Sequence, residues 1–290
     1  MFTGAMVALV TPFQGGEVDF ETLNELVDFQ LDNDIDAIVP VGTTGECPTL
    51  SHEEHKQVVE AVVKRVGGAT RVIAGAGSNS TAEAIELTAF AKKIGADATL
   101  QVCPYYNKPT QEGFYQHFKA IADEVDLPMV LYNIPGRCGA GLTPETIARL
   151  AELDNVVAIK EATGSLDQAS EIAMRCDMTI LSGDDSLTLP LAAVGGKGVI
   201  SVVANIVPAD VKALTDLILE GDLGSARQWH RKLFALSKNM LTLATNPIPI
   251  KAAMAMLEMC SDELRLPMTP LEDNKKGTLR QTLKDYGLLS

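Results

Sequence analysis

Eight short runs of apolar and β-branched residues recur along this chain, and their spacing constrains its fold more than any other feature. They occupy residues 4–10, 36–42, 71–77, 97–103, 128–133, 156–160, 178–183 and 198–203. Successive runs lie roughly 20–35 residues apart, which is the interval at which a strand and a following helix repeat. The pattern therefore predicts eight strand–helix units.

The segments between these runs have helical patterns with recognisable ends. Ser51 with Glu54 three residues later forms a capping box at the start of one helix. Gly95 ends another helix, and Thr143 followed by Pro144 begins a third. These signals place helices after the second, third and fifth runs.

Eight units of this kind predict an α/β fold, a (β/α)₈ TIM barrel, with its chemistry at the carboxyl ends of the strands. We expect the barrel to span residues 1–223 and a C-terminal helical domain to span residues 224–290. The alternative is a doubly wound open sheet. That fold usually has a Gly-rich nucleotide fingerprint after its first strand, where this chain continues into Thr-Pro-Phe.

The composition and charge of the chain argue against several kinds of partner. Of its 290 residues, 46% are hydrophobic and 21% are charged, which is ordinary for a globular protein. Its formal net charge of -14 argues against nucleic acid or an anionic membrane, because both bind clustered lysine and arginine. No apolar run approaches the roughly 20 residues that cross a bilayer.

The cysteines and the N-terminal segment indicate the compartment. Five cysteines are scattered along the chain without C-x-x-C spacing, which predicts reduced thiols. The first residues form a short apolar run with no basic segment before it and no small-residue cleavage pattern after it. We interpret this run as the first strand and expect a cytoplasmic protein.

Lys160 ends the sixth run, at the position where barrel enzymes carry their chemistry. Alternation places Val156, Ala158 and Lys160 on the inner side of the barrel. A free lysine has a pKa of about 10.4, but an apolar interior lowers that pKa and yields an amine that attacks carbonyls to form an imine. The alternative is a core lysine paired with the carboxylate of Asp184 or Asp185.

Three residues with hydroxyl groups lie at or just after the ends of two other runs. Tyr132, with Val130 as its inward companion, could pass protons to and from an imine. Thr43 and Thr44 lie in a turn bounded by glycines, where hydroxyl and backbone N–H groups could hold a small carboxylate. The alternatives are a tyrosine that only packs and a tight turn with two solvated hydroxyls.

Other candidates have weaker signals. Tyr105 and Tyr106 follow the fourth run and are typical of a packing or subunit surface. Arg137 could bind a carboxylate through two hydrogen bonds or be a surface charge. Asp184 and Asp185 could suggest a metal, but no H-x-H ends a strand, so we expect no metal.

These residues fall within motifs that resemble one family. The sequence resembles the N-acetylneuraminate lyase/dihydrodipicolinate synthase superfamily of class I pyruvate aldolases, and within it the dihydrodipicolinate synthase branch. The resemblance covers essentially the whole chain and rests on G-T-T-G-E (42–46), Y-Y (105–106), Y-N-I-P-x-R (132–137), I-K-E-A-T-G (159–164), S-G-D-D (182–185), N-P-I-P-I-K (246–251) and L-R-L-P-M-T-P (264–270).

The resemblance implies an activity and a set of catalytic residues. Lys160 would condense with pyruvate, Tyr132 would shuttle protons, and the enamine would attack L-aspartate 4-semialdehyde in the first committed step of the diaminopimelate and lysine pathway. Thr43 would link Tyr132 to Tyr106 of a neighbouring subunit as a proton relay. The resemblance implies no metal or organic cofactor, and it implies a homotetramer built from two dimers.

The same resemblance implies the residues that bind the substrates. Thr44 would hold the pyruvate carboxylate, with a backbone contact from Ile200 and lining from Gly183. Arg137 would bind the carboxylate of the semialdehyde. This arginine and the double threonine favour the synthase over lyases that cleave N-acetylneuraminate or 2-keto-3-deoxy sugar acids, which are the alternative within the superfamily.

Many members of the family are inhibited by L-lysine at a dimer interface. The corresponding positions here are Cys47, Pro48, His52, His55, Asn79, Glu83 and Tyr105. The alternative for the two histidines is a solvated helix surface. Pro48 lacks a backbone donor, so we expect weak to moderate inhibition. A barrel that binds a small acid without catalysis is the alternative from another class of protein.

Overall fold

A computed structural model of the chain describes residues 2–290 and contains the expected closed barrel. The strands pair in the order β1-β10-β9-β8-β7-β6-β5-β4, and every pair is parallel. Each strand coincides with one of the eight predicted runs: β1 (Gly4–Ala8), β4 (Ala37–Val39), β5 (Arg71–Gly75), β6 (Ala98–Val102), β7 (Met129–Asn133), β8 (Val156–Glu161), β9 (Thr179–Ser182) and β10 (Gly198–Ser201). The (β/α)₈ prediction is confirmed.

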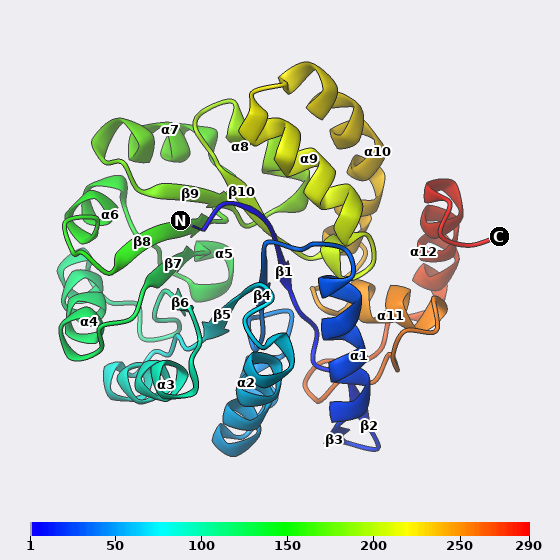
Figure 1. Ribbon diagram of the computed structural model, residues 1–290, viewed down its shortest axis with the longest axis horizontal. Helices are drawn as coiled ribbons and strands as arrows, with labels where there is room; N and C mark the ends of the chain where they lie inside the picture. Colours follow the sequence, from blue (N-terminus) through cyan, green and yellow to red (C-terminus); the bar gives the residue numbers. More distant parts are fainter. Residues whose placement is uncertain (1) are drawn as a thin grey trace.

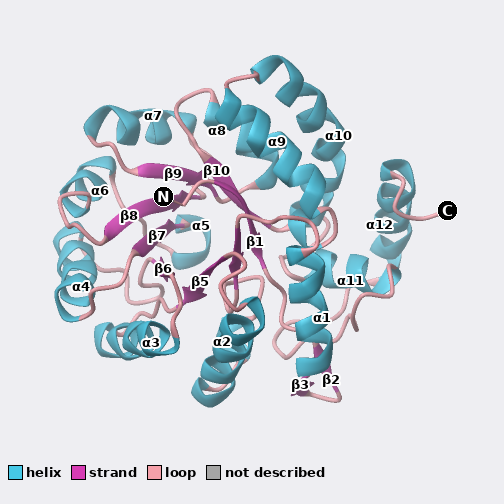
Figure 2. Ribbon diagram, viewed as in Figure 1, coloured by secondary structure: helices cyan, strands magenta, loops and turns pink. Residues whose placement is uncertain are grey.

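Helices surround the strands on the outside of the barrel, except the short α5, which lies within the ring of strands in this view (Figure 2). They are α1 (Phe20–Leu31), α2 (His52–Val66), α3 (Thr81–Ile94), α4 (Gln111–Glu124), α5 (Pro135–Cys138), α6 (Pro144–Leu150), α7 (Leu166–Arg175), α8 (Thr188–Ala192) and α9 (Pro208–Glu220). Short 3₁₀ turns are η1 (Cys47–Thr49), η2 (Asp185–Leu187) and η3 (Val203–Asn205). A small hairpin of β2 (Phe13–Gln14) and β3 (Glu17–Val18) follows the first strand.

The predicted helix ends are confirmed. Ser51 and Glu54 form the reciprocal capping box of α2, and Gly95 adopts φ 89° at the end of α3. Thr143 caps α6, whose first residue is Pro144. Because these caps fix where each helix begins or ends, they also fix the lengths of the loops at the mouth of the barrel.

The orientation predicted for the first residue of β8 is wrong. Val156 packs with the residues between the strands and the outer helices, whereas Ala158 packs inside the barrel. The register of β7 and β8 shifts between Met129 and Val130, so the pleat does not continue unbroken along the strand. A shift of one residue exchanges the two faces of a strand. Beyond this point the alternation is regular.

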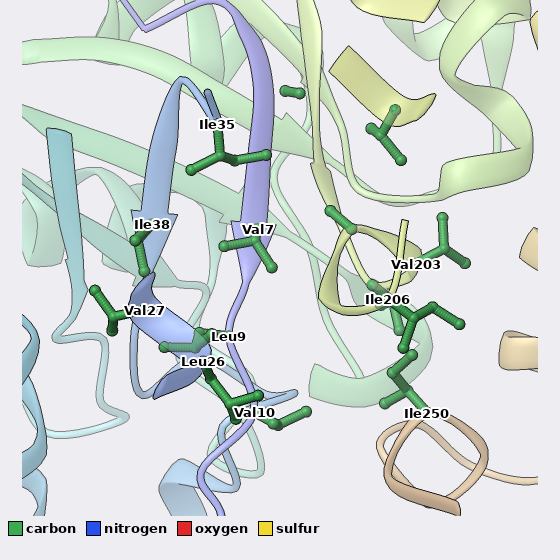
Figure 3. Packing of buried hydrophobic residues seen from close by; sticks show 14 of the residues in the cluster. Val7, Leu9, Val10, Leu26, Val27, Ile35, Ile38, Val203, Ile206 and Ile250 are labelled. Carbon is green, nitrogen blue, oxygen red and sulfur yellow. The ribbon is translucent and has the colours of Figure 1, made fainter. Parts of the chain in front are cut away.

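Three further helices follow the barrel: α10 (Leu223–Thr242), α11 (Ile248–Met256) and α12 (Asp273–Tyr286). They lie on the side of α1 and α9, and α12 is the outermost (Figure 1). Ile250 of α11 belongs to the same core cluster as Val203, Ile206 and Val7, and its side chain lies beside Ile206 (Figure 3). The C-terminal helices are therefore packed directly on the barrel. The boundary at residue 224 stays a prediction.

Two general features accompany this fold. Within residues 2–290, no helix combines the length and the apolar character needed to span a bilayer. All five cysteines are free thiols, as the sequence predicted.

Candidate active site

Lys160 and Tyr132 lie on adjacent strands at the carboxyl end of the barrel. Their Cα atoms are directly paired in the β7–β8 ladder, and Lys160 Nζ lies 4.2 Å from the centroid of the Tyr132 ring. Both side chains are buried, with exposed fractions of 5% and 4%. Tyr132 packs with Val130, as predicted. The strand register thus brings the amine against the phenol.

Burial is the main influence on the amine of Lys160. It lowers the pKa to about 8, against the weaker effect of the Asp185 carboxylate, which raises it. The predicted alternative of a paired lysine is not favoured, because both aspartates bond elsewhere. Asp185 Oδ2 accepts from the backbone N–H of Val202 at 2.9 Å, and Asp184 Oδ1 accepts from Ser186 at 3.0 Å. A lysine with a pKa near 8 carries a useful fraction of neutral amine at pH 7.

The turn between β4 and η1 reaches this pair. A side-chain hydrogen bond joins Thr43 to the Tyr132 phenol, whose pKa burial raises to about 12. Thr43 and Tyr132 also line a small cavity of about 30 Å³ that includes Cys47 and His55. Thr44 is buried, and its hydroxyl accepts a hydrogen bond from Asn246 Nδ2 at 3.0 Å. The two threonines therefore contact different parts of the site.

The remaining substrate-binding candidates surround the amine. Ile200 is buried in the same interior cluster as Tyr132. Gly183 follows β9, and a Cβ there would lie 2.5 Å from the Cβ of Ala162, so the strand ends approach too closely for a side chain. Arg137, on α5, donates to the carbonyl of Asn246 at 2.9 Å. Its positive charge also lowers the pKa of Lys160, which places it close to the site.

Tyr106 is the one catalytic candidate whose side chain points to solvent. It is 89% exposed and adopts φ 70°, a conformation that is uncommon for a residue with a side chain. Neighbouring Tyr105 is 41% exposed. The role of Tyr106 as a relay from a neighbouring subunit stays a prediction.

The seven candidates for an L-lysine site lie on α2, α3, η1 and the adjoining loops, and some of them contact one another. His52 Nε2 lies 2.6 Å from Glu83 Oε1, across the gap between α2 and α3. Asn79 Nδ2 donates to the carbonyl of Tyr105 at 3.2 Å, and Cys47 and Pro48 lie in η1. His55 is not a solvated surface residue, because it is buried with Nε2 2.8 Å from the Gly75 carbonyl. Its pKa is lowered by burial.

Asn246 is a site residue that the sequence reasoning missed. It contacts both Thr44 and Arg137, although it is about 200 and 110 residues away from them along the chain. The motif N-P-I-P-I-K (246–251) was a signal for it, but no chemistry could be assigned to an amide without knowing what it touches. Within residues 2–290, no group of three or more His, Cys, Asp or Glu side chains is arranged to hold a metal ion.

A closed (β/α)₈ barrel with a desolvated lysine amine against a buried phenol at its carboxyl end defines a barrel enzyme of the aldolase type, built for imine chemistry. A model of the dihydrodipicolinate synthetase family matches residues 1–286. The chain belongs to the dihydrodipicolinate synthetase family.

Individual relatives agree over the full length. The chain is 55% identical to the 4-hydroxy-tetrahydrodipicolinate synthase of Pelobacter propionicus, with 100% of both chains covered. The chloride-inhibited synthase of Acinetobacter baumannii, solved with pyruvate, has a TM-score of 0.97 at 43% identity, with 100% of each chain covered. The enzyme from Cyanidioschyzon merolae, solved with lysine bound, has a TM-score of 0.95 at 44% identity, with 99% of each chain covered.

Proposed function

We propose that the chain is a 4-hydroxy-tetrahydrodipicolinate synthase, which condenses pyruvate with L-aspartate 4-semialdehyde through a Schiff base on Lys160. The observation that carries the proposal is the buried Lys160 amine, held against Tyr132 by the strand register. The names of the full-length relatives support the same substrates. The free cysteines favour a cytoplasmic enzyme of lysine and diaminopimelate synthesis.

In the first half-reaction the neutral Lys160 amine attacks the carbonyl carbon of pyruvate. Loss of water gives an imine, with Tyr132 and Thr43 moving the protons. The Thr44 hydroxyl and neighbouring backbone groups of the turn bind the pyruvate carboxylate, near Ile200 and Gly183. Because the imine nitrogen is protonated, it withdraws electrons and lets Tyr132 remove a proton from the methyl group to give an enamine.

In the second half-reaction the enamine carbon attacks the aldehyde carbon of the semialdehyde. Arg137 binds the carboxylate of this substrate, and its guanidinium is held by the Asn246 carbonyl. The free amine of the product then attacks the imine carbon. The carbon–nitrogen bond to Lys160 breaks, the ring closes, and the free lysine is regenerated.

Reductive trapping tests the proposal. Pyruvate and sodium borohydride together are expected to convert Lys160 to a stable secondary amine, which peptide mass mapping locates. Turnover is expected with L-aspartate 4-semialdehyde and not with N-acetylneuraminate. A protein that only binds a small acid would bind pyruvate without a covalent adduct, and that result would overturn the proposal.

The pH dependence of imine formation should report the buried amine. Only neutral Lys160 attacks pyruvate, so we expect the trapping rate to rise with pH along a single ionisation with a midpoint at about 8. The free side chain has its midpoint at 10.5. Rapid-quench trapping across pH 6 to about 10 measures this curve. A midpoint above 10 would mean that the amine is not desolvated before pyruvate binds.

We further propose that Tyr106 acts across a subunit contact in a homotetramer of two dimers. Two adjacent exposed tyrosines are an apolar feature that a subunit contact would cover. Tyr106→Phe is expected to lower turnover by about 10- to 100-fold, because the relay to solvent loses its proton carrier. Imine trapping should remain measurable, and sedimentation should show an unchanged assembly. Unchanged turnover would contradict the relay.

We also propose that L-lysine inhibits the enzyme at the surface formed by α2, α3 and η1. The Glu83 carboxylate and the Asn79 and Tyr105 side chains offer acceptors for a cationic amino acid, and the lysine-bound relative supports this assignment. Weak to moderate inhibition is expected because Pro48 supplies no backbone donor. Titration of L-lysine into the assay measures it, and Glu83→Gln should weaken it. Full activity at millimolar L-lysine would rule out the site.

A further inference from the structure

A buried ion pair joins the active-site turn to the C-terminal helices. Glu46 is the last residue of the turn that carries Thr43 and Thr44, and Lys251 lies on α11. Lys251 Nζ is 2.8 Å from Glu46 Oε1, and the side chains are 0% and 2% exposed. The two residues end the motifs G-T-T-G-E and N-P-I-P-I-K, and the proposed chemistry assigns a role to neither of them.

The pair is part of a fully connected network. Lys251 also donates to the carbonyl of Thr11 at 3.0 Å, and the Thr11 hydroxyl donates to the Gly45 carbonyl at 2.7 Å. The second oxygen of Glu46 accepts from the backbone N–H of Arg265 at 3.2 Å. The Phe13 ring lies under both cations, 4.4 Å from Lys251 Nζ and 4.5 Å from Arg265 Cζ. The turn is thus held through its backbone and through a side chain.

Stability alone does not account for this arrangement. Taking two charges out of water costs several kcal/mol per ion, and a buried ion pair often does no better than apolar residues of the same shape. The turn itself is strained. Val41 and Glu46, at its two ends, have φ of 54° and 57°, and such conformations persist only where the surroundings impose them. The network supplies that constraint at the Glu46 end.

The segment that leads into α11 reaches the substrate groups. Asn246 lies five residues before Lys251. Its side-chain amide donates to the Thr44 hydroxyl, and its backbone carbonyl accepts from Arg137. A hydroxyl whose oxygen accepts one hydrogen bond keeps its own hydrogen to donate. Asn246 therefore leaves the Thr44 hydrogen free for the carboxylate of a keto acid. The Glu46–Lys251 pair connects the turn and this segment at fixed distance.

We propose that Glu46 and Lys251 are positioning residues for the keto-acid site, and that their ion pair sets the distance between the Thr43–Thr44 turn and Asn246. The proposal rests on the function proposed above. Neither residue touches the reacting atoms. The pair acts on how tightly pyruvate is held before the imine forms. The Thr44 hydroxyl that binds its carboxylate is oriented by Asn246, and the pair joins the two segments that carry these residues.

The test uses the double variant Glu46→Gln with Lys251→Met, in the whole purified protein. It removes both charges together, so no unpaired charge is left buried. We expect a folded protein whose half-saturating pyruvate concentration for borohydride trapping is higher by about tenfold or more, since small displacements of binding groups have large effects. The rate of trapping at saturating pyruvate should fall much less. A purely structural role would lower the melting temperature without a larger effect on the half-saturating pyruvate concentration than on the saturated rate.

Lys232→Met is the matched control. Lys232 also pairs with a carboxylate, Asp210 at 2.6 Å, and lies over an aromatic ring, that of Trp229 at 4.6 Å, but it is outside the network. Its pyruvate dependence should match that of the parent. Should the double variant fail to fold, Glu46→Asp keeps both charges and shortens the carboxylate side chain by one methylene group, and it is expected to raise the half-saturating pyruvate concentration in the same way.

The outcomes separate the two proposals. If the parent traps pyruvate on Lys160 and the folded variant has an unchanged half-saturating concentration, the positioning role is overturned and the function stands. An equal change in Lys232→Met would also overturn it, because the effect would then not be specific to the pair. If the parent traps no pyruvate, the proposed function falls and the positioning role falls with it.

Discussion

Lys160→Met is expected to abolish imine trapping and to lower the rate of condensation by about 10³-fold or more, because the covalent route then has no nucleophile. The same change should stabilise the fold. The pKa of Lys160 is lowered to about 8 from 10.5. A charged amine with a lowered pKa destabilises the folded protein at every pH below 8, by about 3 kcal/mol at 1.36 kcal/mol per pKa unit. This penalty fades as the pH rises toward 10.5.

The stabilisation is the diagnostic part of this result. Methionine has a similar length and no charge, so it removes the penalty and retains the packing. Urea unfolding at pH 7 measures the gain, and repeating it near pH 10 should show a smaller one. Lys119→Met, at an exposed ion pair with Asp123, serves as the control and should change both quantities little. Loss of stability in Lys160→Met would show that the amine contributes to the fold and is not held there at a cost.

The sequence was sufficient for the barrel because its signals are local. Each strand is a short apolar run, and each cap at Ser51, Gly95 or Thr143 is a contact between residues a few positions apart. Strand order then follows from the regular repeat of parallel units. The positions of Lys160 and Tyr132 follow as well, since both end their strands and their strands are neighbours.

Features that depend on distant segments could not be predicted. The Val156 error arose from a register shift that leaves no mark in the composition of β8. His55 has the pattern of a helix-surface residue, yet it is buried, and its imidazole contacts the backbone carbonyl of Gly75 on the next strand. Lys251 and Glu46 are charged residues that ordinary patterns assign to solvent, and their burial is explained by their contact with each other and with groups far away in the sequence. Sequence motifs indicated that these segments matter but not which atoms they bring together.

Gly75→Ala is expected to destabilise the protein by about 3 kcal/mol or more, and to weaken pyruvate binding as well, because there is no space for a methyl group. A Cβ at Gly75 would lie 2.1 Å from the carbonyl oxygen of Val41 and 3.1 Å from that of Pro40. Both neighbours are backbone, so no side chain can rotate away. Val41 directly precedes the Gly42–Thr43 segment and already has φ 54°. Any relief of the clash therefore displaces the turn that carries the threonines.

Gly277→Ala is the matched control for this change. Gly277 lies within α12, its Cβ would meet nothing within 4 Å, and its φ is not in the left-handed region. Alanine there should stabilise the protein by up to about 1 kcal/mol, since glycine is the poorer residue inside a helix. Urea unfolding of both variants gives the two free energies, and borohydride trapping gives their pyruvate dependence. A Gly75→Ala protein as stable as the parent would mean that the turn can move, and a turn that moves freely could not hold Thr43 against the phenol of Tyr132.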